Sequence, residues 1–209
     1  MHPAAISQTA NKKIRNGDVI LTYSYSKLVE RALLDAAEAG KKIKVIVADE
    51  RVESLGRSLS SRLVGAGVHT TYILITAISQ VLPSVTKVLL GCDGVMANGC
   101  VLATVGTSQV ALLAKSCNKP VIVCSETYKF TERVQTDSFV YNELLDPQDL
   151  VETRPGRDSQ LADWREQSSL CLLNLVYDLT PASLVDSIVT EISEIPPTSV
   201  PVVLRLHNT

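Results

Sequence analysis

Apolar residues along the chain fall into short runs separated by amphipathic stretches. Runs rich in Val, Ile and Leu predict buried strands over residues 19–23, 43–48, 70–74, 87–90 and 120–124. Between these runs, apolar side chains recur every three or four residues, which predicts helices over residues 27–39, 54–66, 77–82 and 108–116. Because strand and helix alternate through short connections, we expect an α/β fold with a doubly wound, mainly parallel sheet and helices on both faces.

The last third of the chain departs from this pattern. Residues 143–167 carry many charges and two prolines, which predicts a long surface excursion with a short helix near Trp164. After it we expect a strand over 170–177, a helix from 180 to 191 that begins at Thr180-Pro181, and an edge strand over 199–206. Residues 1–15 are expected to be the tail of an upstream helical segment, and residues 16–209 the main domain.

Composition narrows the class of protein. Apolar residues make up 45% of 209, and 20 Lys and Arg oppose 22 Asp and Glu, for a net charge of −2. This excludes a fully disordered chain and argues against a nucleic-acid partner, which usually requires a basic excess. The five cysteines have no C-x-x-C spacing, so we expect neither a disulfide framework nor a metal, and no motif suggests a cofactor. Without a signal peptide or a membrane-spanning run, the expected location is the cytosol.

Ligands in open α/β sheets bind beyond the carboxyl ends of the strands, so polar residues there are the candidates for a site. Ser24, Asp49 and Asp93 follow predicted strands. The two aspartates suit acid–base work or the capping of turns. Gly106, followed by two hydroxyl residues at a helix start, predicts either an anion cradle or ordinary capping. No histidine follows a strand, and neither a G-x-G-x-x-G nor a P-loop motif occurs.

Longer strings resemble a known superfamily. The similar strings are IRNGDVILT at residues 14–22, the stretch 91–107 and KPV at 119–121. This superfamily contains two groups of proteins. The first comprises the regulatory subunits of eukaryotic translation initiation factor two-B. The second comprises the isomerases of methylthioribose-1-phosphate and ribose-1,5-bisphosphate. The resemblance implies a Rossmann-like domain and covers nearly the whole chain from Ile14.

Other strings resemble one branch of this superfamily, the delta-type regulatory subunits. They are CSETYKF at residues 124–130, ERVQTD at 132–137, LLNLVYD at 172–178 and SVPVVLR at 199–205. Such long strings are specific. This resemblance implies a noncatalytic regulatory and scaffold subunit of the guanine nucleotide exchange factor for initiation factor two, which supports assembly and stress-responsive control of translation. The implied partners are alpha-, beta-, gamma- and epsilon-type subunits and initiation factor two itself.

The alternative function is that of a sugar-phosphate aldose–ketose isomerase. By resemblance, such isomerases use a cysteine and an aspartate as the acid–base pair. Ser24 stands at the cysteine position and Asp93 at the aspartate position. A hydroxyl is a far poorer proton donor or acceptor than a thiol near neutral pH. We therefore expect a vestigial ligand pocket, with no catalytic residues, where the following residues converge: Ser24, Asp93, Asn98, Gly99, Gly106 and Thr107.

A subunit interface is expected at the predicted strand over 170–177. Strand alternation would send Leu173 and Leu175 to one face of it and Asn174 to the other. One face can fill the core while the other reaches a partner. The predicted interface residues are Phe139, Leu170, Leu173 and Leu175.

Overall fold

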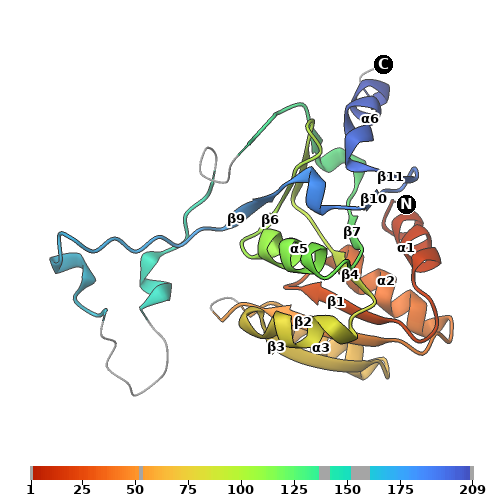
Figure 1. Ribbon diagram of the computed structural model, residues 1–209, viewed down its shortest axis with the longest axis horizontal. Coiled ribbons are helices and arrows are strands. Elements are labelled where there is room, and N and C mark those ends of the chain that lie inside the picture. Colours follow the sequence, from red (N-terminus) through yellow and green to blue (C-terminus); the bar gives the residue numbers. More distant parts are fainter. Residues whose placement is uncertain (1, 52–53, 137–141, 152–160, 208–209) are drawn as a thin grey trace.

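The computed structural model describes residues 2–51, 54–136, 142–151 and 161–207. Its main element is a seven-stranded sheet with strand order β11-β10-β7-β4-β1-β2-β3, parallel except for β11 (Figure 1). The strands are β1 (Val19–Tyr23), β2 (Lys44–Asp49), β3 (His69–Leu74), β4 (Lys87–Leu90), β7 (Val121–Cys124), β10 (Ser187–Val189) and β11 (Glu194–Ile195). The predicted mainly parallel α/β fold is confirmed.

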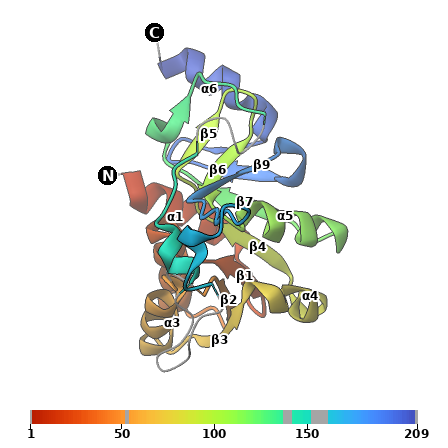
Figure 2. The same cartoon turned by 90° about the vertical axis from the view of Figure 1, so that its left-hand side faces the viewer.

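Helices cover both faces of this sheet, as Figure 2 shows. They are α1 (His2–Lys13), α2 (Lys27–Glu38), α3 (Gly56–Gly65), α4 (Ile78–Val81), α5 (Thr107–Ser116) and α6 (Val200–His207). Short 3-10 turns occur at Ile75–Ala77, Leu82–Ser84, Thr127–Lys129, Pro147–Leu150, Trp164–Glu166, Ala182–Leu184 and Pro197–Ser199. Within the described ranges, no helix has the length and apolarity needed to cross a membrane.

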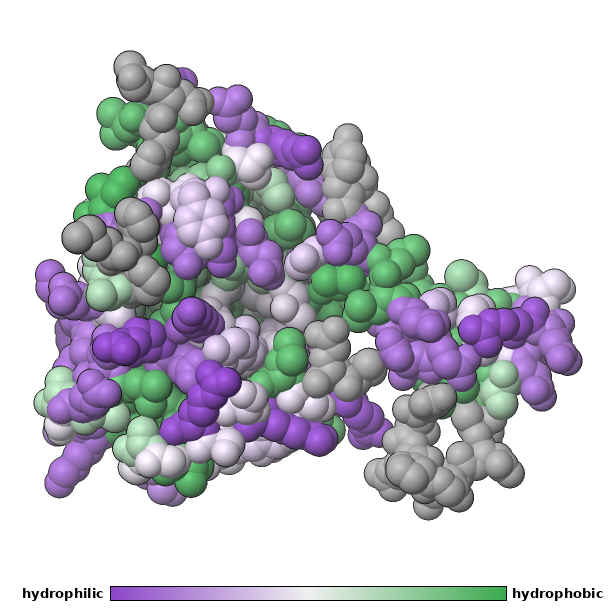
Figure 3. All heavy atoms as spheres, turned by 180° about the vertical axis from the view of Figure 1, so that it is seen from behind, coloured by the Kyte–Doolittle hydropathy of each residue, from purple (hydrophilic) through white to green (hydrophobic). Residues whose placement is uncertain are grey.

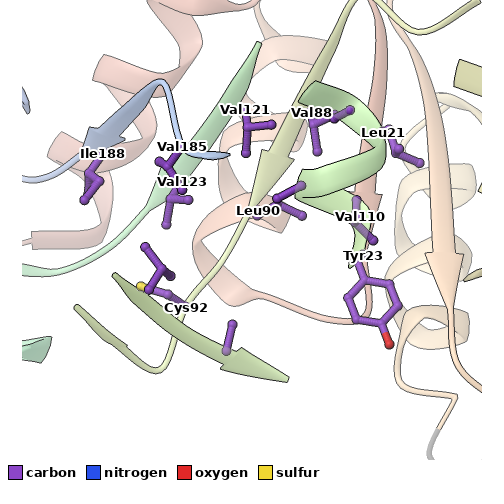
Figure 4. Close-up of a cluster of buried hydrophobic side chains, with 14 of the residues drawn as sticks. Leu21, Tyr23, Val88, Leu90, Cys92, Val110, Val121, Val123, Val185 and Ile188 are labelled. Atoms are coloured by element: carbon purple, nitrogen blue, oxygen red, sulfur yellow. The ribbon is translucent and has the colours of Figure 1, made fainter. Parts of the chain in front are cut away.

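Alternating side chains of the strands build two separate cores. Ile20 and Leu89 lie in the core beneath α1, α2 and α3, whereas Leu21 and Leu90 lie in the core beneath α4 and α5. Figure 4 shows side chains of the second core, among them Leu21 of β1, Leu90 of β4 and Val110 of α5. Because each parallel strand is buried on both faces, its sequence reads as a continuous apolar run, and this made the first five strands predictable.

Helix α1 belongs to the first of these cores. Ile6 and Ala10 on the helix, and Ile14 just after it, are buried and pack with apolar residues of α2. The helix is therefore an integral part of the folded unit. That it also ends a longer upstream helical segment stays a prediction.

A second sheet, which the sequence analysis did not predict, has four strands in the order β8-β5-β6-β9. They are β5 (Gly94–Met96), β6 (Val101–Thr104), β8 (Phe130–Thr131) and β9 (Tyr177–Thr180). The hairpin of β5 and β6 turns at Asn98-Gly99, where Gly99 has φ 80°. Asn-Gly is a strong hairpin signal, so the sequence held the information needed to predict this turn as a hairpin.

Three predicted elements near the carboxyl end are wrong. The expected strand over 170–177 begins only at Tyr177, the expected helix over 180–191 contains strand β10, and the expected edge strand over 199–206 is helix α6. Strand β10 lies between β7 and β11, where Ile188 and Val189 are fully buried on opposite faces. In α6, Val200, Val203 and Leu204 have helical spacing and pack on the core, and Pro201 lies in the first turn, where a helix tolerates proline.

The segments 142–151 and 161–176 form an arm that projects from the body, at the left of Figure 1. Its two segments are joined by an antiparallel bridge between Leu144 and Leu175, and the amide of Leu145 donates to the carbonyl of Asn174. At its base, Asn142 both donates to and accepts from the backbone of Tyr177. The predicted surface excursion and the short helix at Trp164 are confirmed.

Candidate functional site

A pocket of about 290 Å³ lies at the carboxyl edge of the seven-stranded sheet. The neighbouring strands β1 and β4 end there, and the chain leaves them toward opposite faces of the sheet. Such a switch point leaves a crevice between the connections, which is where ligands bind in open α/β folds. Its lining residues are Tyr23 to Lys27 after β1, Gly91 to Asp93 after β4, and also Leu55, Ala103, Thr104, Thr107 and Lys129.

Three of the six residues predicted for the vestigial pocket line it: Ser24, Asp93 and Thr107. The other three residues, Asn98, Gly99 and Gly106, do not line it. The Asn98 amide donates to the carbonyl of Gln135 at 3.0 Å, and Gly99 packs so closely on Pro197 that a Cβ would lie 2.6 Å from its carbonyl oxygen. Asn98 and Gly99 thus fix the β5–β6 turn. Whether the pocket is vestigial stays a prediction.

Ser24 is held at the end of β1 in an unusual backbone conformation. Its φ is 54°, a left-handed value that costs a non-glycine residue about 1 kcal/mol or more. The side chain is 3% exposed, and its Oγ makes no hydrogen bond within the described chain. The pocket therefore contains a fixed, uncharged hydroxyl at the position where, by resemblance, isomerases have a thiol.

The nearest buried thiols do not replace the missing cysteine. Burial raises the pKa of Cys92 to about 11 and that of Cys124 to about 12. Cys92 lines the pocket, but its Sγ points to the carbonyl oxygen of Cys124 at 3.8 Å. A thiol that stays protonated near pH 7 is a poor base, so neither sulfur offers the pocket a thiolate.

Asp93 is an exposed residue of the pocket, which Lys129 also lines. Partial burial of its carboxyl raises the pKa of Asp93, and the Lys129 ammonium opposes that rise. Lys129 donates to the carbonyl of Cys92 at 2.8 Å and pairs with Glu126 at 3.1 Å. The Lys129 charge is thereby tied to the protein's own carboxylate and carbonyl.

The amino end of α5 is occupied by a carboxylate of the same chain. The backbone amides of Gly106 and Ser108 both donate to Oδ2 of Asp178, at 2.8 and 2.9 Å. An anion at this position is favoured by the helix dipole and the free amides. The predicted anion cradle is therefore filled internally, and the capping alternative is the correct one, with Asp178 rather than a hydroxyl as the cap.

Tyr23 closes the space between β1 and α5. Its hydroxyl donates to the carbonyl of Val105 at 2.6 Å. A Cβ added to Gly106 would lie 2.4 Å from the Tyr23 hydroxyl oxygen. Figure 4 shows the ring at the end of the apolar cluster, with the hydroxyl directed away from it. Gly106 thus has a packing role beside the pocket.

Two charged residues of the site were not predicted. Lys129 follows β7 by five residues, at the same sheet edge as the predicted candidates, and Asp178 sits on a strand that was expected to end before it. The other candidate carboxylate, Asp49, is fully buried and accepts from the Tyr72 hydroxyl at 3.0 Å. It is fixed by these contacts and does not line the pocket. Across the described residues, no His, Cys, Asp or Glu cluster is suited to a metal ion.

The mainly parallel sheet and the polar pocket at its switch point place the chain in the class of Rossmann-like α/β proteins. The profile of the Initiation factor 2 subunit family matches residues 2–197, and the chain belongs to this family. It is 48% identical over 207 residues to Translation initiation factor eIF2B subunit delta of Dictyostelium discoideum. That alignment covers 98% of this chain and 33% of the other protein. The subunit of the same name from Schizosaccharomyces pombe is 43% identical, with 96% of this chain and 44% of that protein covered.

The isomerase branch is more distant. Ribose 1,5-bisphosphate isomerase of Pyrococcus furiosus is 33% identical, over 92% of this chain and 57% of the enzyme. Among solved structures, the tetrameric eIF2B-beta2-delta2 complex from C. thermophilum matches with a TM-score of 0.78 and 31% identity, over 91% of this chain and 55% of that one. The predicted resemblance to delta-type subunits is thus confirmed. The chain spans a third to less than half of the length of the two delta subunits.

Proposed function

We propose that this chain acts as a noncatalytic regulatory and scaffold subunit of the guanine nucleotide exchange factor for initiation factor two. The observation that carries this proposal is the Ser24 hydroxyl at the end of β1. Without a titratable group there, Asp93 has no partner for moving a proton between two carbons of a sugar. The distant likeness to isomerases supports a shared scaffold rather than a shared reaction.

The arm supports an assembly role. Leu173 on it is 51% exposed and Leu144 is 68% exposed, while Asn174 between Leu173 and Leu175 is buried and donates to the carbonyl of Asp146. Figure 3 shows hydrophobic side chains gathered where the arm leaves the body. Large exposed apolar side chains on a projecting segment are typical of a protein–protein contact.

The predicted interface residues fit this surface in part. Leu170 and Leu175 are half-buried on the arm and Leu173 is exposed, whereas Phe139 lies outside the described residues. We propose that a beta-type subunit covers these leucines, since a solved relative is named as a beta2-delta2 complex. Alpha-, gamma- and epsilon-type subunits and initiation factor two are further proposed partners, in the cytosol.

The test compares catalysis with assembly. We expect no conversion of methylthioribose-1-phosphate or ribose-1,5-bisphosphate above the buffer rate, and a mixed complex when the chain is expressed with a beta-type subunit. Native mass spectrometry of the purified complex checks the second expectation. Turnover that Asp93→Asn abolishes would overturn the noncatalytic assignment in favour of the isomerase, because it would require the pocket to react.

A further inference from the structure

A second hollow lies at the opposite, amino edge of the sheet. Its volume is about 400 Å³, and it lies between the α2–β2 and α3–β3 connections, at the end where the strand arrows of Figure 1 begin. We call it the basic groove. It is lined by Ala37, Gly40, Lys41, Lys42, Ile43, Lys44, Ala66, Gly67, Val68 and His69.

The cations of the basic groove exceed what the fold uses. Helix carboxyl ends attract cations, and the Lys41 ammonium meets that need by donating to the carbonyls of Asn11 and Ile14, at 2.6 and 2.7 Å. Lys42 and Lys44 are exposed, and their ammonium groups have no hydrogen-bond or ion-pair partner among the described residues. Two positive charges are thus left available at one rim.

Neighbouring residues extend this positive rim. Lys42 accepts from the amide of Gly17 and donates its own amide to Asn16, so the turn that follows Arg15 runs beside it. Arg15 itself is exposed. The carboxylate of Asp18, just before β1, already pairs with Lys87 at 2.6 Å, and Glu38 is the exposed acid at the end of α2.

The floor of the basic groove is apolar. Ile43 and Val68 are each 6% exposed there, and Ala37 and Ala66 form the sides. Among the described residues that line the groove there is no Phe, Tyr or Trp, although aromatic rings are what single-stranded nucleic acids stack on. The whole chain also has a net charge of −2 rather than a basic excess. A cationic rim over an aliphatic floor instead complements a peptide whose acidic and apolar side chains alternate.

We propose that the basic groove binds an extended acidic segment of a partner protein, with carboxylates on Lys42 and Lys44 and apolar side chains on Ile43 and Val68. This site lies at the edge of the sheet opposite the candidate pocket and apart from the leucines of the arm. It is therefore a second interaction surface, independent of the proposed contact with a beta-type subunit.

The experiment measures binding of a short fluorescent peptide, in which glutamates alternate with leucines, to the full chain by anisotropy. We expect saturable binding that weakens as salt is raised, because exposed charges are screened. The double variant Lys42→Glu/Lys44→Glu should bind about tenfold less tightly or worse. The matched control is Arg57→Glu/Arg133→Glu, which makes the same change in net charge at exposed positions outside the groove.

The outcomes separate the possibilities. A loss confined to the groove variant, with unchanged thermal unfolding and unchanged assembly with a beta-type subunit, supports the proposal. Absence of peptide binding, or an equal loss in both double variants, would overturn it, since the second result would reflect net charge alone. Tighter binding of poly-uridine through the same lysines would also overturn it, in favour of a nucleic-acid site.

Discussion

Ser24 and Asp178 carry the chemical argument at the scale of single residues. Ser24 offers the pocket an uncharged hydroxyl in a left-handed backbone conformation. Asp178 supplies an internal anion to the amides of Gly106 and Ser108, where an external anion would otherwise be favoured. Both residues reduce what the pocket can do with a charged substrate.

Asp178 should make the stability of the protein depend on pH. Burial raises its pKa from 3.8 to about 6, against the opposing effect of the two amides. The folded state therefore holds the proton more tightly, so this residue's contribution is fully present below pH 3.8 and is lost as pH rises through about 6. Between about pH 4 and pH 7, the free energy of unfolding of the unmodified chain should fall by up to about 3 kcal/mol relative to Asp178→Asn.

Urea unfolding of both proteins at several pH values measures this difference. The Asn variant keeps a side-chain oxygen for the amides of α5 but cannot ionise, so it is the appropriate reference. A constant difference across this pH range would show that Asp178 titrates alike in the folded and unfolded chains.

Single residues also decide how much of the site could be predicted from the sequence. Ser24 directly follows β1 and Asp93 comes three residues after β4, both strands that the sequence predicts, and both residues line the pocket. Lys129 could not be predicted because it reaches the pocket from the end of a 3-10 turn, and no local pattern reports that direction. Asp178 was missed because its partner, the amide of Gly106, lies 72 residues away in sequence.

At the scale of elements, the start of α5 depends on glycine. Gly106 has φ 102°, and an added Cβ would meet the Tyr23 hydroxyl at 2.4 Å. Gly106→Ala should therefore lower the free energy of unfolding by about 2 kcal/mol or more, through backbone strain and overpacking. Chemical denaturation measures the loss.

Gly65→Ala is the matched control for that change. Gly65 ends α3, has no positive φ, and has nothing within 4 Å of an added Cβ. It should leave stability unchanged or raise it by up to about 1 kcal/mol. Equal effects of the two substitutions would mean that the close approach of Tyr23 is not important for stability.

The elements also differ in how far the sequence predicts them. Strands β1, β2, β3, β4 and β7 were predictable because most of their residues are apolar and parallel strands bury both faces. Strand β10 could not be predicted, because the spacing of Leu184, Val185, Ile188 and Val189 also suits a helix. Only the position of this segment between β7 and β11 decides for a strand. In α6, Pro201 is compatible with an edge strand, but the first turn of a helix accepts proline equally well.

At the scale of the whole molecule, three surfaces lie on different parts of the fold. The candidate pocket is at the carboxyl edge of the sheet, the basic groove is at the amino edge, and the leucines of the arm lie on a segment that projects from the body (Figure 1). With this separation, the proposed partners would not compete for one surface.

The most direct measurement is sedimentation velocity of the chain with a beta-type subunit, before and after Leu173→Glu/Leu175→Glu. A charge on the exposed Leu173 and another on the half-buried Leu175 should abolish the mixed complex, because a buried unpaired carboxylate is costly at an interface. The control is Val64→Glu/Leu112→Glu, which changes an exposed valine of α3 and an exposed leucine of α5. This variant should still assemble. A chain that stays monomeric beside the beta-type subunit, or an arm variant that assembles as well as the control, would contradict the proposed role of this protein as an assembly subunit.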